Sequence, residues 1–545
     1  MYKDKLKDTP REALNWRLWY GVLVFGLMGA ARGLDEGLIG TSSTQPSFIN
    51  RFGLKDEDLS KHDQAQLLSN ITSMVQMGSI LGALVGFYFN DRLGRIWATR
   101  QLCFLWILGI AIFLAAGSNG SIGMVYAGRF IAGIGIGQTT IAGPTYLAEV
   151  APKAIRGLCV TVFSGSVYLG IMLAYFASWG SSIHIGDDTE AQWIVPNSIH
   201  IMFAAVILGL SFFAVESPRW LVKVGKDDVA LLNLSKLRGL PGEHPLIQAE
   251  LTDIKCALER EQEATRGAGP IGIVKELFLD KGNRYRIMML SLLSQLLSQW
   301  SGASSITIYA PEYFAMMGTS GQNEKLFATA ILGIVKFVSA IICALFLIDF
   351  IGRKRSLLIG ITLQLLSMLY MAIFLVSDSN VGEEDVVQSP SQKRAAMGAI
   401  VMIYLSGAGW ALGFNSIQYL INSEIYPLRL RSIGSSIAMT FHFVNQYGNS
   451  KAVPLMFLDM TEGGTMFFFT AVTLLGLLWA IFLLPELSGM SLESIDRVFE
   501  LPWWQIGLRG RKVAKEQIAY AEAYDRDGKH AMVSSEDVQT VERKA

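Results

Sequence analysis

The chain is dominated by long apolar stretches that are separated by short polar loops. A helix needs about 20 mostly apolar residues to cross the hydrocarbon of a bilayer, because its backbone polar groups find no water there and must bond to one another. Twelve stretches meet this requirement, so the sequence predicts an all-α membrane protein with twelve transmembrane helices. The predicted spans are 18–42, 65–90, 97–117, 121–148, 158–179, 197–215, 285–316, 325–348, 355–376, 394–422, 432–457 and 463–484.

The composition supports the same class of protein. Hydrophobic residues make up 51% of the 545 residues and charged residues only 17%, whereas soluble domains carry about 25% charged residues. The formal net charge is zero, which gives no electrostatic reason to expect a nucleic-acid partner. The four cysteines form no spaced pair, and the sequence shows no metal-ligand cluster or catalytic constellation. We therefore expect no metal, no cofactor and no enzymatic activity.

One long polar interval divides the spans into two groups of six. Its charged, helix-forming segments are interrupted by Gly and Pro, which predicts a helical linker outside the membrane. Lys and Arg gather in the loops after the second, fourth, eighth and tenth spans, so the positive-inside rule places these loops and both termini in the cytosol. The expected division is a cytosolic N-terminus at 1–17, a six-helix half at 18–215, a cytosolic helical linker at 216–284, a second six-helix half at 285–485 and a cytosolic tail at 486–545.

Three short motifs occur at matching places in the two halves. The pairs are D-R-L-G-R at 91–95 with D-F-I-G-R at 349–353, E-V-A-P-K-A-I-R at 149–156 with E-I-Y-P-L-R-L-R at 424–431, and, more weakly, E-S-P-R at 216–219 with P-E-L-S-G at 485–489. Matched motifs in the same order indicate an internal duplication, which predicts a solute site between two similar halves.

These motifs, together with G-R-F-I-A-G-I-G-I-G at 128–137, P-T-Y-L-A-E at 144–149 and E-S-P-R-W at 216–220, resemble the signature of the sugar porter family of the major facilitator superfamily. The resemblance covers roughly residues 18–500, and within the family it points to fungal proton symporters of sugars and sugar acids. It implies the major facilitator fold and a secondary active transporter that works by alternating access. It also implies a monomeric functional unit in the plasma membrane.

Asp35 is the residue that we expect to carry the coupled proton. A carboxylate inside the first span is costly in hydrocarbon, so it should face a cavity or a partner. The family resemblance implies that Arg129 in the fourth span is this partner. Desolvation favours the protonated carboxyl and a nearby cation favours the ionised form, so a change in their balance permits proton uptake and release. A purely structural ion pair is the alternative.

Arg32 is the main departure from the family pattern, in which that position usually holds an aromatic residue facing the solute. A guanidinium suits bidentate binding of a carboxylate, so the substitution predicts an anionic solute. The alternative is that Glu36, or Asp35 on the same helical face, neutralises Arg32 within the protein. We expect Glu36 to be either a second protonatable group or a residue at the rim of the cavity.

Other positions that face the solute in the family also differ in this chain. Ser298 and Ser304 replace a Gln and an Asn of the family pattern in the seventh span. In the eleventh span, His442 and Phe443 replace an amide–Trp pair of the family. Loss of long amides and gain of a basic group favour a solute other than a neutral hexose. With Arg32, the expected substrate-binding residues are Ser164, Gln299, Ser304, Tyr309, Asn415, Gln418, Tyr419, His442 and Gln446. For each of them a polar contact between helices is the alternative.

Acidic and basic residues recur together in the predicted cytosolic loops of both halves. We expect them to pair between helix ends when the cytosolic side closes and to separate when it opens, although the Arg residues alternatively only fix topology. The expected gate residues are Asp91, Arg92, Arg95, Glu149, Arg156, Glu216, Arg219, Asp349, Arg353, Glu424 and Arg431. Lys336 in the eighth span is expected to face the cavity or a partner, without an assigned role.

The pattern as a whole favours proton-coupled uptake of a monosaccharide or sugar acid, with D-galacturonate as the first candidate and quinate-like acids next. A proton symporter of a neutral pentose or hexose, such as arabinose, rhamnose or glucose, is the main alternative and requires that a carboxylate of the protein satisfies Arg32. A non-transporting sugar sensor is disfavoured because the polar tail is short. The expected partners are the solute, H⁺ and the lipid bilayer.

Overall fold

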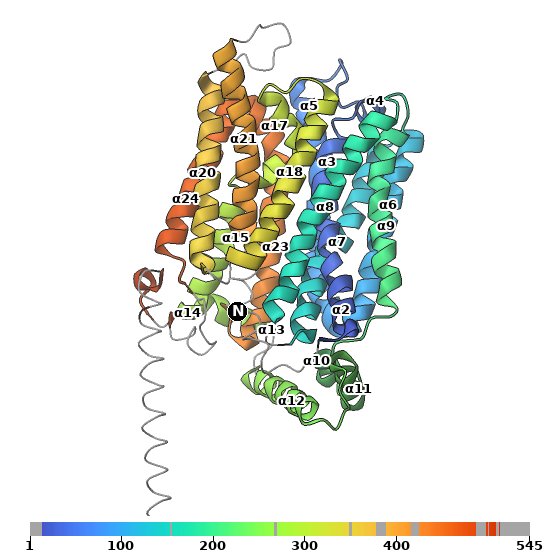
Figure 1. Ribbon diagram of the computed structural model, residues 1–545, viewed down its shortest axis with the longest axis vertical. Helices are drawn as coiled ribbons and strands as arrows, with labels where there is room; N and C mark the ends of the chain where they lie inside the picture. The colour runs from blue at the N-terminus through green and yellow to red at the C-terminus, as the bar shows by residue number, and fades with distance from the viewer. Residues whose placement is uncertain are drawn as a thin grey trace, which may run out of the picture.

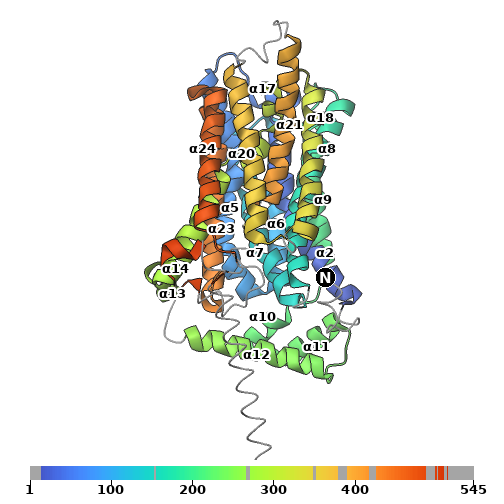
Figure 2. The ribbon, with the colours of Figure 1, turned by 60° about the vertical axis from the view of Figure 1, so that its left-hand side comes forward.

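The computed structural model describes residues 14–152, 155–265, 270–347, 351–377, 389–415, 425–486, 498–499, 501–507 and 512. These residues form helices and turns and contain no strand. Long helices stand side by side, and three further helices lie beyond one end of them (Figures 1 and 2). These three are α10 (Pro218–Lys223), α11 (Asp227–Arg238) and α12 (Pro245–Thr265). We call their end of the molecule the linker end and the opposite one the far end.

The first half of the chain supplies one set of long helices. They are α2 (Trp16–Leu27), α3 (Gly29–Ser42), α5 (Lys61–Leu93), α6 (Arg95–Asn119), α7 (Ile122–Val150), α8 (Arg156–His184) and α9 (Ala191–Ser211), with the short α4 (Pro46–Phe52) at the far end. The first predicted span is thus divided at Met28 into α2 and α3. Every residue of α3 is buried, so this helix lies in the interior rather than against lipid.

The second half contains more interruptions. After α13 (Pro270–Leu279) and α14 (Lys281–Arg284) come η2 (Tyr285–Leu292), α15 (Leu293–Gln299), α16 (Ala303–Ile308), α17 (Ala310–Met316), α18 (Gln322–Ile342), η3 (Cys343–Leu347), α20 (Arg353–Ser377), α21 (Pro390–Leu412), α23 (Leu428–Asp459) and α24 (Thr461–Phe482). The seventh predicted span is therefore a row of four segments from η2 to α17. Gly302, at a φ of 85°, separates α15 from α16, and Pro311 lies in the first turn of α17.

Each predicted span overlaps a helix or a row of helical segments in the described residues, which confirms the all-α expectation. Eight of the described helices are long and apolar enough to cross a membrane by length and composition alone. The interrupted first and seventh spans are not among them, because each is divided into helices shorter than 18 residues, and α7 and α23 are long enough but not apolar enough. The predicted start of the sixth span at 197 is too late, since α9 begins at Ala191, where Gln192 is buried and bonds to Ser47.

The two halves meet along two pairs of helices, α5 with α23 and α8 with α18. At the far end they are in close contact, because Gly40 of α3 packs directly against the backbone carbonyl of Ile308, where no larger side chain fits. Nearer the linker end an apolar groove of about 290 Å³ lies between residues 158–169 and 337–344. The seam is thus closed at the far end by the contact of Gly40 with Ile308 and grooved nearer the linker end.

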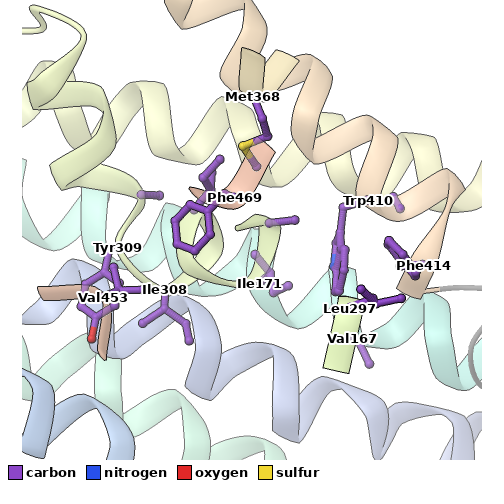
Figure 3. Close-up of a cluster of buried hydrophobic side chains, with 14 of the residues drawn as sticks. Val167, Ile171, Leu297, Ile308, Tyr309, Met368, Trp410, Phe414, Val453 and Phe469 are labelled. Atoms are coloured by element: carbon purple, nitrogen blue, oxygen red, sulfur yellow. The ribbon is translucent and has the colours of Figure 1, made fainter. Parts of the chain in front are cut away.

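A large apolar cluster crosses the seam and holds the middle of the second half together. Figure 3 shows the ring of Trp410 from α21 beside Leu297 of α15 and above Val167 of α8. These side chains and Ile171 are each at most 7% exposed, so they exclude water from the residues behind them. The cluster fixes the positions of α15 and α16, which carry several of the polar residues described below.

Candidate functional site

Two buried ion pairs involve residues of α3 between Arg32 and Glu36, and one of them has its partner on α7. Asp35 Oδ1 lies 3.3 Å from Arg129 Nη2 of α7, and Arg32 Nε donates a 2.7 Å hydrogen bond to Glu36 Oε1. All four side chains are buried. Because charges in a membrane interior are stabilised by partners, this pairing explains how α3 holds three ionisable residues without exposing them to lipid.

Arg129 is held from two sides. In addition to Asp35, its Nε donates a 2.8 Å hydrogen bond to the carbonyl oxygen of Ile71, and its Nη2 approaches the carbonyl oxygen of Thr72 at 3.4 Å. Asp35 Oδ1, by contrast, makes no well-aligned hydrogen bond within the described residues. The predicted partners Asp35 and Arg129 are therefore together in the structure.

The second ion pair reaches the other half of the molecule. Gln446 Nε2 of α23 donates a 2.7 Å hydrogen bond to Glu36 Oε1, the same oxygen that accepts from Arg32. The guanidinium of Arg32 also lies 5.9 Å from the ring centre of Phe443 on α23. Of the alternatives for Arg32, the structure shows neutralisation by Glu36, so this guanidinium already contacts a carboxylate of the protein.

His442 and two glutamines form a polar cluster beside these pairs. His442 Nδ1 lies 2.7 Å from Gln295 Oε1, which requires a hydrogen on Nδ1 and leaves Nε2 as an acceptor in the neutral ring. Gln299 Nε2 lies 3.3 Å from the same ring nitrogen, which cannot accept its hydrogen while Nδ1 carries one of its own. Both Gln299 Oε1 and His442 Nε2 are buried without a hydrogen-bond partner among the described residues. Two buried polar side chains whose hydrogen bonds are incomplete suit a ligand with hydroxyl groups, which both donate and accept.

Tyr309 makes hydrogen bonds to both halves of the molecule. Its hydroxyl lies 2.7 Å from Thr72 Oγ1 of α5 and donates a 2.7 Å hydrogen bond to the carbonyl oxygen of Ser450 on α23. It therefore joins the two halves toward the far end. The carbonyl oxygen of Thr72 also accepts a hydrogen bond from Arg129. Polar contacts therefore lead from the Asp35–Arg129 pair to the hydroxyl of Tyr309.

The remaining predicted binding residues are distributed unevenly. Ser304, in α16, and Asn415, which follows α21, are buried near the seam, and Ser164 lies in α8 one turn before Tyr168. Ser305, next to Ser304, donates a 2.7 Å hydrogen bond to Asn449. Gln418 and Tyr419 lie outside the described residues.

Several predicted gate residues form one network at the linker end of the first half. Arg95 makes a 2.6 Å contact with Glu149 and a 3.3 Å contact with Asp91. Glu216 accepts hydrogen bonds of 3.1 Å from the backbone N–H groups of Arg95 and Ile96, and so caps the start of α6. Burial raises the pKa of Glu216 above its ordinary value, although these donors oppose the shift.

The second half repeats the carboxylate cap of the first. Glu486 Oε2 accepts a 3.2 Å hydrogen bond from the backbone N–H of Lys354 at the start of α20. In both halves a glycine at positive φ precedes the capped helix, Gly94 at 90° and Gly352 at 98°, and a Cβ there would approach the carboxylate within 2.8 Å. The acids of the weak sequence match, Glu216 and Glu486, thus cap the starts of α6 and α20 in the same way.

The other predicted gate residues are less informative. Arg92 contacts the hydroxyl of Tyr88, and the structure gives neither Arg92 nor Arg219 an ion pair with any residue that it describes. Arg353 begins α20. Asp349 and Glu424 lie outside the described residues, as do the side chains of Arg156 and Arg431. Each ion pair seen among the described residues lies within the first half and the linker helices, so the predicted pairing between halves stays a prediction.

Sequence reasoning missed three contributors to this site. Gln295 orients His442, Thr72 connects Arg129 to Tyr309, and Trp410 covers Val167 and Leu297. Gln295 lies one helical turn before Gln299, so helical spacing is the signal that points to it. Thr72 and Trp410 come from helices that only the tertiary structure brings here.

Polar and ionised side chains buried between two halves of a helical membrane protein define a membrane transporter rather than an enzyme. The chain belongs to the sugar (and other) transporter family, whose model matches residues 21–499. Its fold is that of the major facilitator superfamily, as expected from the sequence.

Relatives and solved structures agree with this assignment. A probable quinate permease of Neosartorya fischeri is 31% identical over 505 residues, which cover 92% of this chain and 90% of the relative. The quinate permease of Emericella nidulans is 30% identical over 501 residues, or 91% of each chain. The xylose transporter XylE from E. coli, in a partially occluded inward open conformation, matches with a TM-score of 0.71 at 21% identity, over 88% of this chain and 100% of that one. The proton:xylose symporter XylE bound to 6-bromo-6-deoxy-D-glucose gives a TM-score of 0.72 at 22% identity, over 89% of this chain and 99% of that one.

Proposed function

We propose that this transporter imports a polyhydroxylated monocarboxylate together with H⁺, with quinate as the first candidate and D-galacturonate as a second member of the same class. The observation that carries the proposal is the pair of buried polar side chains, Gln299 and His442, each with an atom that has no hydrogen-bond partner among the described residues, beside ionised residues. Such groups match the hydroxyl groups that these solutes share, because a hydroxyl both donates and accepts. The names of the relatives move quinate ahead of D-galacturonate.

The charges around the site support an acid more than a neutral sugar. Arg32, Arg129 and Lys336 are buried in the spans near the seam, against the two carboxylates of Asp35 and Glu36. Arg32 and Arg129 each contact one of these carboxylates, whereas Lys336 has no carboxylate within ion-pair distance among the described residues. A solute carboxylate can pair with this ammonium, whereas a neutral hexose cannot.

A neutral pentose or hexose remains the second candidate because of one specific observation. Arg32 already contacts Glu36 at 2.7 Å, which is what a carrier of neutral solutes requires of that residue.

Asp35 and Arg129 are the proposed proton-coupling pair. When the carboxyl is protonated it no longer attracts Arg129, so the contacts of Arg129 with α5 are free to change. Alternating access then follows from the difference between the two ends of the seam. We place the linker end in the cytosol of a plasma-membrane protein that acts as a monomer, with its charged loops as the gate.

Uptake assays test the proposal directly. Labelled quinate should accumulate in fungal cells that lack quinate transport and express this chain, faster at acidic than at neutral pH, and a protonophore should abolish the accumulation. Unlabelled quinate and D-galacturonate should compete, while arabinose, rhamnose and glucose should compete weakly. Uptake of glucose with no competition by either acid would establish the second candidate instead. Cells expressing Asp35→Asn at the same surface level serve as the matched control.

A further inference from the structure

Lys336 is the one buried cation of the seam that has no role in the site described above. It lies in the middle of α18 and is fully buried. A lysine at the centre of a membrane span costs about 2.5–3.5 kcal/mol or more, so its presence calls for a compensating interaction.

The direct contacts of Lys336 are with uncharged groups. Its ammonium donates a hydrogen bond to the hydroxyl of Thr307 on α16. Gly407 of α21 leaves room for its stem, because a Cβ at that position would lie 3.2 Å from Lys336 Cε. Within the described part of the chain, no carboxylate lies within ion-pair distance of this ammonium.

Glu36 is the acid whose charge acts on Lys336, and it also forms an ion pair with Arg32. Its Oε1 accepts hydrogen bonds from both Arg32 and Gln446. Asp35, the other carboxylate of α3, is in contact with Arg129. Arg32 therefore contacts Glu36 directly, whereas Lys336 makes no contact with a carboxylate among the described residues.

The surroundings of Lys336 suit a ligand that bridges these helices. Thr307 lies one turn after Ser304 on α16, so the two hydroxyls share a helical face. Tyr175 of α8 donates a 2.6 Å hydrogen bond to the carbonyl oxygen of Thr307, which fixes this part of α16 against the first half. A carboxylate placed beside Lys336 would thus contact α16 and α18 of one half. It would also neutralise the ammonium of Lys336, on which the charge of Glu36 of α3 acts.

We propose that Lys336 binds the carboxylate of the transported solute and thereby selects hydroxycarboxylates over neutral sugars, an inference that rests on the function proposed above. Removal of the ammonium then takes away an interaction that only a charged solute makes. Uncharged analogues, which rely on the hydroxyl contacts alone, keep their affinity.

The test compares binding of quinate and of its uncharged methyl ester to the purified transporter by calorimetry. We expect the wild type to prefer quinate, and Lys336→Met to weaken quinate binding about 30-fold, the effect of removing one partner of a buried charge pair. Binding of the ester should change by less than about threefold, which corresponds to under 1 kcal/mol. Lys325→Met, at the far end of the same helix, is the control and should leave both constants unchanged.

Lys336→Gln provides the same comparison with a side chain that still donates a hydrogen bond to Thr307, so the test does not depend on Lys336→Met folding. Equal losses for quinate and ester show that Lys336 only supports the fold, and unchanged constants show that the carboxylate binds elsewhere. Both results overturn the inference and leave the proposed function standing. A wild type that binds neither quinate nor D-galacturonate overturns the proposed function, and the role of Lys336 with it.

Discussion

The two ion pairs of α3 are neighbours in sequence but differ in what they connect. Asp35 pairs with Arg129 on α7, so its partner belongs to another helix of the same half. Arg32 pairs with Glu36 on its own helix, and Glu36 accepts a hydrogen bond from Gln446 of the other half. The first pair therefore fixes the packing inside one half, while the second links α3 directly to α23.

This difference suggests that the two ion pairs have different roles in transport. Protonation of Asp35 changes the charge felt by Arg129, and polar contacts lead from Arg129 to the second half through Thr72 of α5 and Tyr309. A change at Glu36 alters the contact between the halves at once, because the same oxygen binds Arg32 and Gln446. We therefore expect substitutions in the first pair to abolish coupling and those in the second to alter affinity and closure.

The largest effect is expected for Asp35→Asn, which cannot carry a proton. For one proton per solute, a pH difference of one unit supports about tenfold accumulation in the wild type, since it supplies about 1.4 kcal/mol. The variant should reach only equal concentrations on both sides in proteoliposomes, while exchange of labelled for unlabelled solute continues. Asp58→Asn, an exposed residue of the loop before α5, should accumulate as the wild type does. Concentrative uptake by Asp35→Asn would assign the proton to another group.

Glu36→Gln is expected to have the next largest effect, in the opposite sense for an anionic solute. It removes the carboxylate that contacts Arg32 and whose charge acts on Lys336, so quinate should bind about tenfold more tightly relative to its methyl ester, a gain of about 1.4 kcal/mol. The loss of a buried ion pair should also lower the free energy of unfolding by about 3 kcal/mol. Calorimetry and thermal unfolding in detergent measure the two effects. If quinate binding weakens more than ester binding, Glu36 does not compete with the solute carboxylate.

Gln446→Leu should have the smallest effect of the three. It removes one hydrogen bond to an ionised group, worth about 1.5 kcal/mol, and leaves the contact between Arg32 and Glu36 intact. The distribution of distances between spin labels on α3 and α23 should broaden. The affinities for quinate and for its methyl ester should fall by equal factors. Asn445→Leu is the matched control, because Asn445 is buried on the same helix but bonds to Trp300 of its own half. Equal broadening in both variants would remove Gln446 from the link between the halves.

Much of the architecture could be predicted from the sequence because membrane helices obey a strict length and polarity rule. The spans 97–117 and 463–484 correspond closely to α6 and α24, which are predominantly apolar and long enough to cross a bilayer. The rule is weaker for α3 and for the segments from η2 to α17, where buried polar residues and Gly302 interrupt the pattern. Those interruptions lie in the interior, where other helices satisfy the backbone.

The sequence predicted several residues of the site but not which of them pair. Asp35 and Arg129 were expected together on the basis of the family resemblance, and they are together. For Arg32 the spacing allowed either Asp35 or Glu36, because residues three and four apart on a helix both lie within reach. Tyr309 was expected to face the solute, and whether it does so in another state of the transport cycle stays a prediction. In this structure its hydroxyl joins α5 to α23.

The sequence by itself determined that this chain spans a membrane many times as two related halves and that charged residues lie within the spans. Those properties depend on local polarity and on motifs that repeat along the chain. The tertiary structure alone decided that Glu36 bonds Gln446 and that Lys336 donates to Thr307. Such contacts join residues of different helices, and their existence depends on how helices rotate and approach, which hydrophobic periodicity does not specify.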